Sequence, residues 1–123
     1  MRILLIIGLI LAAFAVLFGA FGAHFLKPRL SAEDLAIFET AVRYQMYHAL
    51  GIVLIGVLGF HVPHNLILLP SYFMISGILI FSGTLFLLLY TNVKWFGAIT
   101  PIGGTFLIIG WLYLAFNIYH HNI

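Results

Sequence analysis

Four runs of mostly apolar residues follow one another along the chain, and each is long enough to cross a membrane as a helix. A spanning helix needs ~20 predominantly apolar residues, and the predicted helices occupy residues 3–23, 32–60, 66–90 and 100–118. Charged residues make up only 7% of the 123, against about 25% in soluble domains. A soluble fold of this size could not hide so much apolar surface. The sequence therefore predicts an all-α integral membrane protein.

The segments between the apolar runs are short: "HFLKPRLSAED", "HVPHN" and "TNVKW". Short connections make consecutive helices antiparallel neighbours, which predicts an up-down bundle of four transmembrane helices forming one domain over residues 1–123. The first run also resembles a signal peptide, because one arginine precedes it and small residues follow. It is longer than the usual 7–15-residue apolar region of such peptides, so we expect a retained helix.

The few charges are concentrated in one part of the chain. All three carboxylates (Glu33, Asp34 and Glu39) lie close to Lys27, Arg29 and Arg43, whereas Arg2 and Lys94 lie elsewhere. Five basic residues are too few for a nucleic-acid interface, and the absence of cysteine excludes thiol chemistry. The positive-inside rule places the first and third loops in the cytoplasm and both termini outside.

The second helix is predicted to begin outside the membrane. Ser31 is a candidate N-cap, and Glu33 and Asp34 fall in the first turn, where the helix dipole favours acidic side chains. A helix from there to Phe60 would measure ~43 Å at 1.5 Å per residue, whereas the hydrocarbon is ~30 Å thick. We therefore expect this helix to enter the membrane near Glu39.

The richest polar stretch, "FETAVRYQMYHAL" (Phe38 to Leu50), lies at this membrane entrance. At helical spacing its polar residues form a broad arc and its apolar residues form the opposite stripe. Polar side chains deep in a membrane usually face the protein interior or a wet cavity. We therefore expect the polar arc to face the other helices and the stripe to face lipid; the stripe consists of Leu35, Phe38, Val42, Met46 and Ala49.

The predicted topology brings further polar residues to the same membrane leaflet. Pro101 either lies within the fourth helix and kinks it, or occupies the first helical position after Thr100 as N-cap, where proline fits well. We expect the second arrangement. The polar residues that share this leaflet suggest a polar vestibule open to one side of the membrane. The candidate ligand-binding or structural cluster consists of His24, Glu39, Arg43, Tyr44, Gln45, His48, Ser82 and Thr100.

Small residues on three helices predict close helix packing, because they let backbones approach in membranes. They are Ala15, Gly19 and Ala23 on the first helix, Gly77 and Gly83 on the third, and Gly103 and Gly104 on the fourth.

No motif in the sequence points to catalysis. Six histidines invite a metal or haem, but there is no HExxH ligand pair and no cysteine. Ser82 and His48 could form a nucleophile and base, yet no GxSxG motif supports it. We therefore predict no enzyme activity, no metal and no cofactor.

Two functional classes stay open. The first is a structural, interaction or small-ligand-binding role that uses the one-leaflet cluster. The second is a proton or small-ion channel or transporter, acting as an oligomer, because intramembrane ionisable groups are functional candidates. The expected partners are the lipid bilayer and either a second copy of the chain or another membrane protein, without nucleic acid.

Four motifs in order resemble the transmembrane-protein-256-like family of small membrane proteins, which carry a domain of unknown function. They are "GAFGAH" (Gly19 to His24), "TAVRYQMYHAL" (Thr40 to Leu50), "GILIFSGTL" (Gly77 to Leu85) and "TPIGG" with "GW" (Thr100 to Gly104, Gly110 and Trp111). The resemblance implies a four-helix multi-pass protein of the bacterial cytoplasmic membrane and brings no established activity, substrate or cofactor. Phe25 stands where the family commonly has glycine after the histidine.

Overall fold

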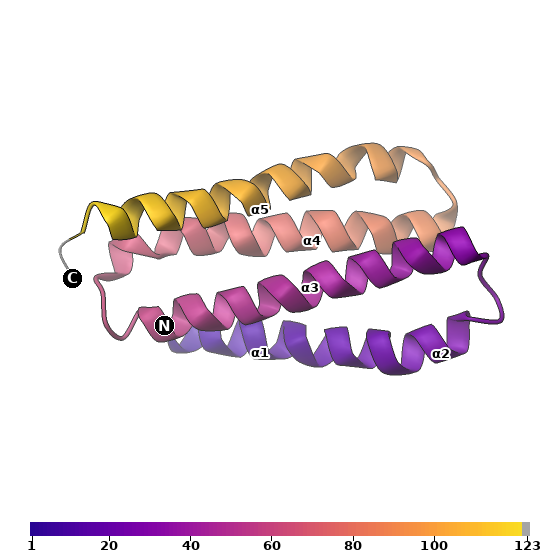
Figure 1. Ribbon diagram of the computed structural model, residues 1–123, viewed down its shortest axis with the longest axis horizontal. Helices are drawn as coiled ribbons and strands as arrows, with labels where there is room; N and C mark the ends of the chain where they lie inside the picture. The colour runs from indigo at the N-terminus through magenta and orange to yellow at the C-terminus, as the bar shows by residue number, and fades with distance from the viewer. Residues whose placement is uncertain (122–123) are drawn as a thin grey trace.

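Four long helices run up and down in the computed structural model, which describes residues 1–121 (Figure 1). The elements are α1 (Arg2–Val16), a π-helix η1 (Leu17–Gly22), α2 (Ala23–Leu26), α3 (Ala32–Leu58), a 3-10 turn η2 (His64–Leu66), α4 (Leu68–Thr91) and α5 (Trp95–Tyr119). The segments η1 and α2 continue α1, so Arg2–Leu26 forms one span. Four helices in the described residues are long and apolar enough to cross a membrane. The predicted fold class is confirmed.

The helices pack in the order α1, α3, α4, α5, with each helix resting mainly on the next. Figure 1 shows α1 and α5 at the two edges of this arrangement and α3 and α4 between them. An apolar core forms where η2 and the loop before it meet the helices, and it contains Leu4, Ile52, Ile55, Val62, Ile67 and Met74. Most large apolar side chains outside this core are exposed, as expected for surfaces that contact lipid.

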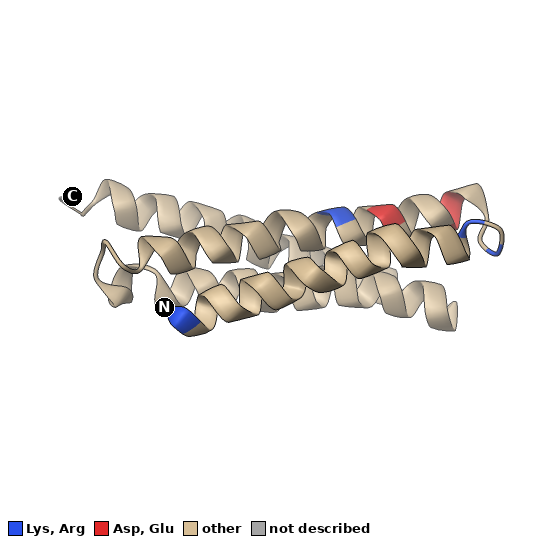
Figure 2. Ribbon diagram, turned by 90° about the horizontal axis from the view of Figure 1, so that it is seen from below, with Lys and Arg blue, Asp and Glu red and all other residues tan. Residues whose placement is uncertain are grey.

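The start of α3 follows the prediction. The Asp34 backbone N–H donates to Ser31 Oγ at 3.1 Å, so Ser31 is the N-cap. At 27 residues the helix measures ~40 Å, which exceeds the ~30 Å of hydrocarbon. Figure 2 shows one basic segment beside the N-terminus at one end of the bundle and the other coloured charges in the opposite half. The charged first turns of α3 therefore belong to the membrane surface.

The predicted start of the fourth helix is wrong. The helix α5 begins at Trp95, with Lys94 as its N-cap, and Pro101 lies inside it. The two aromatic residues that follow Lys94 suit the membrane interface, where tryptophan is enriched, so the helix starts there rather than deeper. Thr100 is consequently an interior helical residue of α5.

Small residues bring α4 and α5 together, but only some of the predicted ones do so. A Cβ on Gly103 would lie 2.8 Å from the Gly77 carbonyl oxygen and 2.9 Å from the Phe81 Cα, so these two backbones are in direct contact. On the first span, a Cβ on Gly19 would lie 3.1 Å from Val42 Cγ1. The expectation fails at Gly83, where a Cβ would meet nothing within 4 Å.

Substitution of the two adjacent glycines of α5 should separate packing from helix propensity. Gly103→Ala forces a methyl group against the α4 backbone and should lower the free energy of unfolding by about 1–3 kcal/mol. Gly104→Ala is the matched control, because its Cβ would meet Phe81 at an ordinary 3.7 Å. It should be neutral or stabilising by up to ~1 kcal/mol. Unfolding in mixed detergent, followed by circular dichroism, measures both; equal effects would contradict the backbone contact.

Candidate functional site

The buried face of α3 differs from the prediction. Phe38 is 6% exposed and Ala49 is fully buried, and the other stripe residues are half-buried, so the apolar stripe does not simply face lipid. Glu39 and Arg43 are exposed. The expectation that the polar arc faces inward holds for Gln45 and His48, which are buried. It is wrong for the charged residues, because charged side chains near the interface can reach water and headgroups, which avoids the cost of burial. The inward seam recurs every three or four residues and mixes apolar with polar positions: Phe38, Ala41, Gln45, His48, Ile52 and Ile55.

Two hydrogen bonds join α3 to its immediate neighbours. The Gln45 amide Nε2 donates to the Leu11 carbonyl oxygen of α1 at 2.9 Å. The Ser82 hydroxyl of α4 donates to the Ala41 carbonyl oxygen at 2.6 Å. Both acceptors are main-chain oxygens, which keep a second lone pair after accepting their helical bond. These bonds therefore fix α1 and α4 against α3 without interrupting any helix.

His48 links α3 to the far helix α5. The Trp111 indole N–H donates to His48 Nε2 at 3.0 Å, and His48 Nδ1 lies 2.8 Å from the Tyr44 carbonyl oxygen. An indole nitrogen can only donate, so Nε2 is the acceptor and the ring proton sits on Nδ1. Both ring nitrogens of His48 are therefore engaged within the protein. The Trp111 ring also covers Gly51, where a Cβ would lie 2.9 Å from it.

Two further bonds tie down α5. The hydroxyls of Thr84 on α4 and Thr100 on α5 lie 2.7 Å apart in a buried hydrogen bond. Near the other end of α5, Asn117 Nδ2 donates to the Leu66 carbonyl oxygen in η2 at 2.8 Å. Each pair of adjacent long helices is thus joined by at least one side-chain hydrogen bond, since α1–α3 and α3–α4 are joined by Gln45 and Ser82.

The structure buries half of the predicted cluster, but these four residues hydrogen-bond to other partners rather than to one another. Gln45, His48, Ser82 and Thr100 are buried. Tyr44 is 38% exposed and contributes its carbonyl oxygen and a ring that stacks on Phe81 at 4.7 Å. His24, Glu39 and Arg43 are exposed on the outside.

Sequence reasoning missed Trp111, Thr84 and Asn117 as members of this set. Trp111 lies in an apolar run with no polar neighbour at helical spacing. Its role depends on the side chain that reaches it from α3, 63 positions away in the sequence. Thr84 was recognisable only as a polar residue near Ser82, because its partner lies on another helix.

The sealed polar side-chain atoms of residues 1–121, the buried nitrogens and oxygens, are all hydrogen-bonded. In the same part of the chain, no three histidine or acidic side chains lie close enough to hold a metal ion. The arrangement can hold helices in register, and its chemistry is that of neutral hydrogen bonds.

The fold and these bonds define a class: a four-span α-helical membrane protein whose helices are joined by buried side-chain hydrogen bonds. The comparison with known proteins gives the family. The chain belongs to the family described as "Protein of unknown function (DUF423)", which matches residues 18–104.

Relatives in two bacterial genera resemble the chain over nearly its whole length. The UPF0382 membrane protein SSP2132 of Staphylococcus saprophyticus is 44% identical over 115 residues, covering 94% of this chain and 95% of the relative. The UPF0382 membrane protein YwdK of Bacillus subtilis is 38% identical over 116 residues, covering 94% of each. No solved structure matches the chain.

The two tryptophans of the chain provide a matched test of the α3–α5 link. Trp111→Phe removes the indole N–H and leaves His48 Nε2 without a donor, so the free energy of unfolding should fall by about 1–2 kcal/mol. Trp95→Phe is the control, because Trp95 is 60% exposed and stacks only on Phe96, and it should change stability by less than ~0.5 kcal/mol. Equal losses in the two variants, measured by unfolding in mixed detergent, would show that the indole bond does not stabilise the bundle.

Proposed function

We propose that the chain is a non-enzymatic protein of the bacterial cytoplasmic membrane, with a structural, interaction or small-ligand-binding role. In this proposal the buried polar residues hold the four helices in a fixed arrangement. The observation that carries it is that every buried polar side-chain atom in residues 1–121 is already hydrogen-bonded within the chain. We also propose that, within its family, the chain is most similar to the transmembrane-protein-256-like proteins.

The partners of Ser82 and His48 favour this role over hydrolysis. A serine nucleophile needs its proton accepted by a neighbouring base. Here the Ser82 hydroxyl donates its hydrogen bond to the Ala41 carbonyl oxygen, and the accepting nitrogen of His48 is covered by Trp111. Each of the two residues thus has a structural partner in place of a catalytic one.

The alternative function is conduction of protons or small ions, which would use His48 as the buried ionisable group. A proton carrier needs a nitrogen that is free to accept and release a proton. The occupied Nε2 of His48 therefore favours the structural role.

Flux measurements test the choice between the two functions. Proteoliposomes that contain the wild-type chain should show no pH-driven or voltage-driven proton or cation flux above empty vesicles, because the buried polar groups are paired with one another. The fluorescence of a pH-sensitive dye follows this flux. His48→Ala is the control, and flux in the wild type that this variant abolishes would overturn the proposal in favour of conduction.

The proposed orientation places the first and third loops in the cytoplasm. The chain contains no cysteine, so a single introduced thiol reports its own position against a silent background. In intact cells a membrane-impermeant maleimide should label His61→Cys in the second loop and leave Lys27→Cys and Lys94→Cys unlabelled until the membrane is permeabilised. The reverse pattern would show the opposite orientation.

A further inference from the structure

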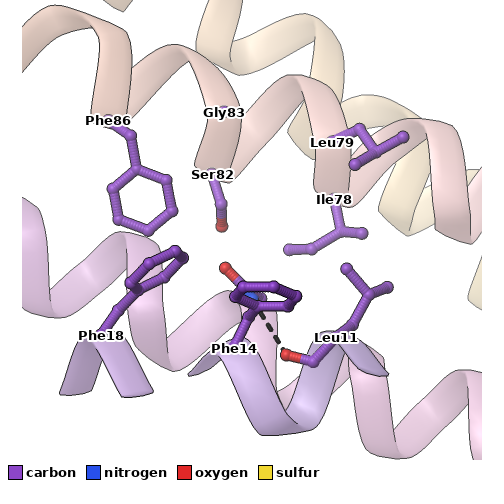
Figure 3. Close-up of a pocket in the computed structure, with 9 residues that line it drawn as sticks. Leu11, Phe14, Phe18, Ile78, Leu79, Ser82, Gly83 and Phe86 are labelled. Atoms are coloured by element: carbon purple, nitrogen blue, oxygen red, sulfur yellow. Dashed lines mark hydrogen bonds between the residues drawn. The ribbon is translucent and has the colours of Figure 1, made fainter. Parts of the chain in front are cut away.

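A groove opens between the first span and α4, with α3 as its floor. Its volume is about 210 Å³, and Gln45 and Ser82 are the only polar residues among the side chains that line it. Figure 3 shows Leu11, Phe14 and Phe18 on one side, facing Ile78, Ser82 and Phe86 of α4. The groove exists because α1 and α4 both pack on α3 and only sparsely on each other.

One end of the Gln45 amide has no hydrogen-bond partner among residues 1–121. The Leu11 carbonyl can only accept a hydrogen bond, so the amide nitrogen must face it and Oε1 must lie at the other end of the group. Among residues 1–121 no donor reaches this oxygen, although the side chain is only 6% exposed. Because no sealed polar atom of these residues lacks a partner and Gln45 lines the groove, Oε1 has a narrow opening, and the groove wall around it is almost entirely apolar.

A ligand in the groove should therefore carry a hydrogen-bond donor. The Ser82 hydroxyl donates its hydrogen bond to the Ala41 carbonyl oxygen. Toward the groove it presents only lone pairs, as Gln45 Oε1 does. A single water, whose share of liquid volume is ~30 Å³, could donate to these oxygens but would leave most of the 210 Å³ empty. The remaining wall is apolar and would not hold further waters.

The depth of Gln45 in the membrane and the aromatic wall of the groove restrict the class of ligand further. Gln45 lies six residues beyond Glu39, or ~9 Å deeper along the helix, where phospholipid acyl chains carry no donor. The wall is aromatic: Phe18 meets Phe86 edge-on at 5.4 Å and Phe14 at 5.9 Å. Aromatic rings favour further rings at such tilted, offset distances. A planar ring with a hydroxyl group fits both the wall and the floor.

We propose that this groove binds an apolar phenol, the chemical class that includes the reduced head groups of membrane quinols. The ring packs against Phe14, Phe18 and Phe86, and the phenolic hydroxyl donates to Gln45 Oε1. An oxidised quinone has carbonyl oxygens in place of hydroxyls and no donor for this oxygen. The site therefore prefers the reduced form.

The test uses duroquinol and duroquinone, the reduced and oxidised forms of one small ring, with the protein in lipid nanodiscs under anaerobic conditions. Ligand-observed NMR with empty nanodiscs subtracted should show saturable binding of duroquinol and at least about tenfold weaker binding of duroquinone. Thymol, a simple phenol, distinguishes the source of the ligand: equal affinity assigns the groove to phenols in general, and weaker affinity assigns it to quinols.

Gly83 offers a way to fill the groove without disturbing the fold. It lines the groove, and a Cβ placed there would meet nothing within 4 Å. Gly83→Leu should abolish duroquinol binding, and Gly83→Ala should weaken it partly. Gly104→Leu on α5, which lies outside the groove, is the matched control and should bind like the wild type.

Three results would overturn the proposal. The first is the absence of duroquinol binding above empty nanodiscs, which would mean that lipid or water fills the groove. The second is equal affinity for duroquinol and duroquinone. The third is unchanged duroquinol binding in Gly83→Leu. A dimeric mass in the nanodisc together with absent binding would assign the groove to a second copy of the chain. The structural role of the interhelical bonds does not depend on the ligand, because Gly83 takes part in none of them.

Discussion

The fold depends on the hydrogen bonds that α3 makes to all three other long helices. Apolar side chains contact lipid tails as readily as they contact one another, so the hydrophobic effect gives four membrane helices little reason to choose one arrangement. Gln45 reaches α1, the Ala41 carbonyl receives Ser82 from α4, and His48 receives Trp111 from α5. Measured bonds of this kind average only ~0.6 kcal/mol, so their main contribution is to fix which residues meet.

Close packing and hydrogen bonding act on different helix pairs. Between α4 and α5 the backbones touch at Gly77 and Gly103, and the Thr84–Thr100 bond adds a polar link along the same contact. Between the first span and α4 there is no such approach, and the space becomes the groove. The lack of a side chain therefore has opposite consequences at two glycines. At Gly103 it lets the backbones of α4 and α5 touch, whereas at Gly83 it leaves empty space in the groove.

The sequence predicted the spans, their antiparallel order and the Ser31 cap, because these features follow from local patterns of apolar runs and capping residues. It also pointed to Gln45, His48, Ser82 and Thr100 as inward polar residues. It failed where the outcome depended on another helix or on the interface. The exposed positions of Glu39 and Arg43 reflect solvation near the membrane surface, and Trp111 becomes a bonding partner only through its contact with α3.

The two ends of one amide connect the structure to the proposed ligand. If Gln45 served packing alone, an apolar residue of similar volume would fill the seam between Ala41 and Ala49 without a polar atom to satisfy. Its nitrogen faces α1 because the Leu11 carbonyl can only accept, and the planar geometry of the amide then turns the oxygen away from this carbonyl, toward the groove. An acceptor that faces an apolar groove without a donor is unfavourable within the membrane. A donor from a ligand removes that cost, so the same residue that holds α1 in place also selects a hydroxyl-bearing occupant.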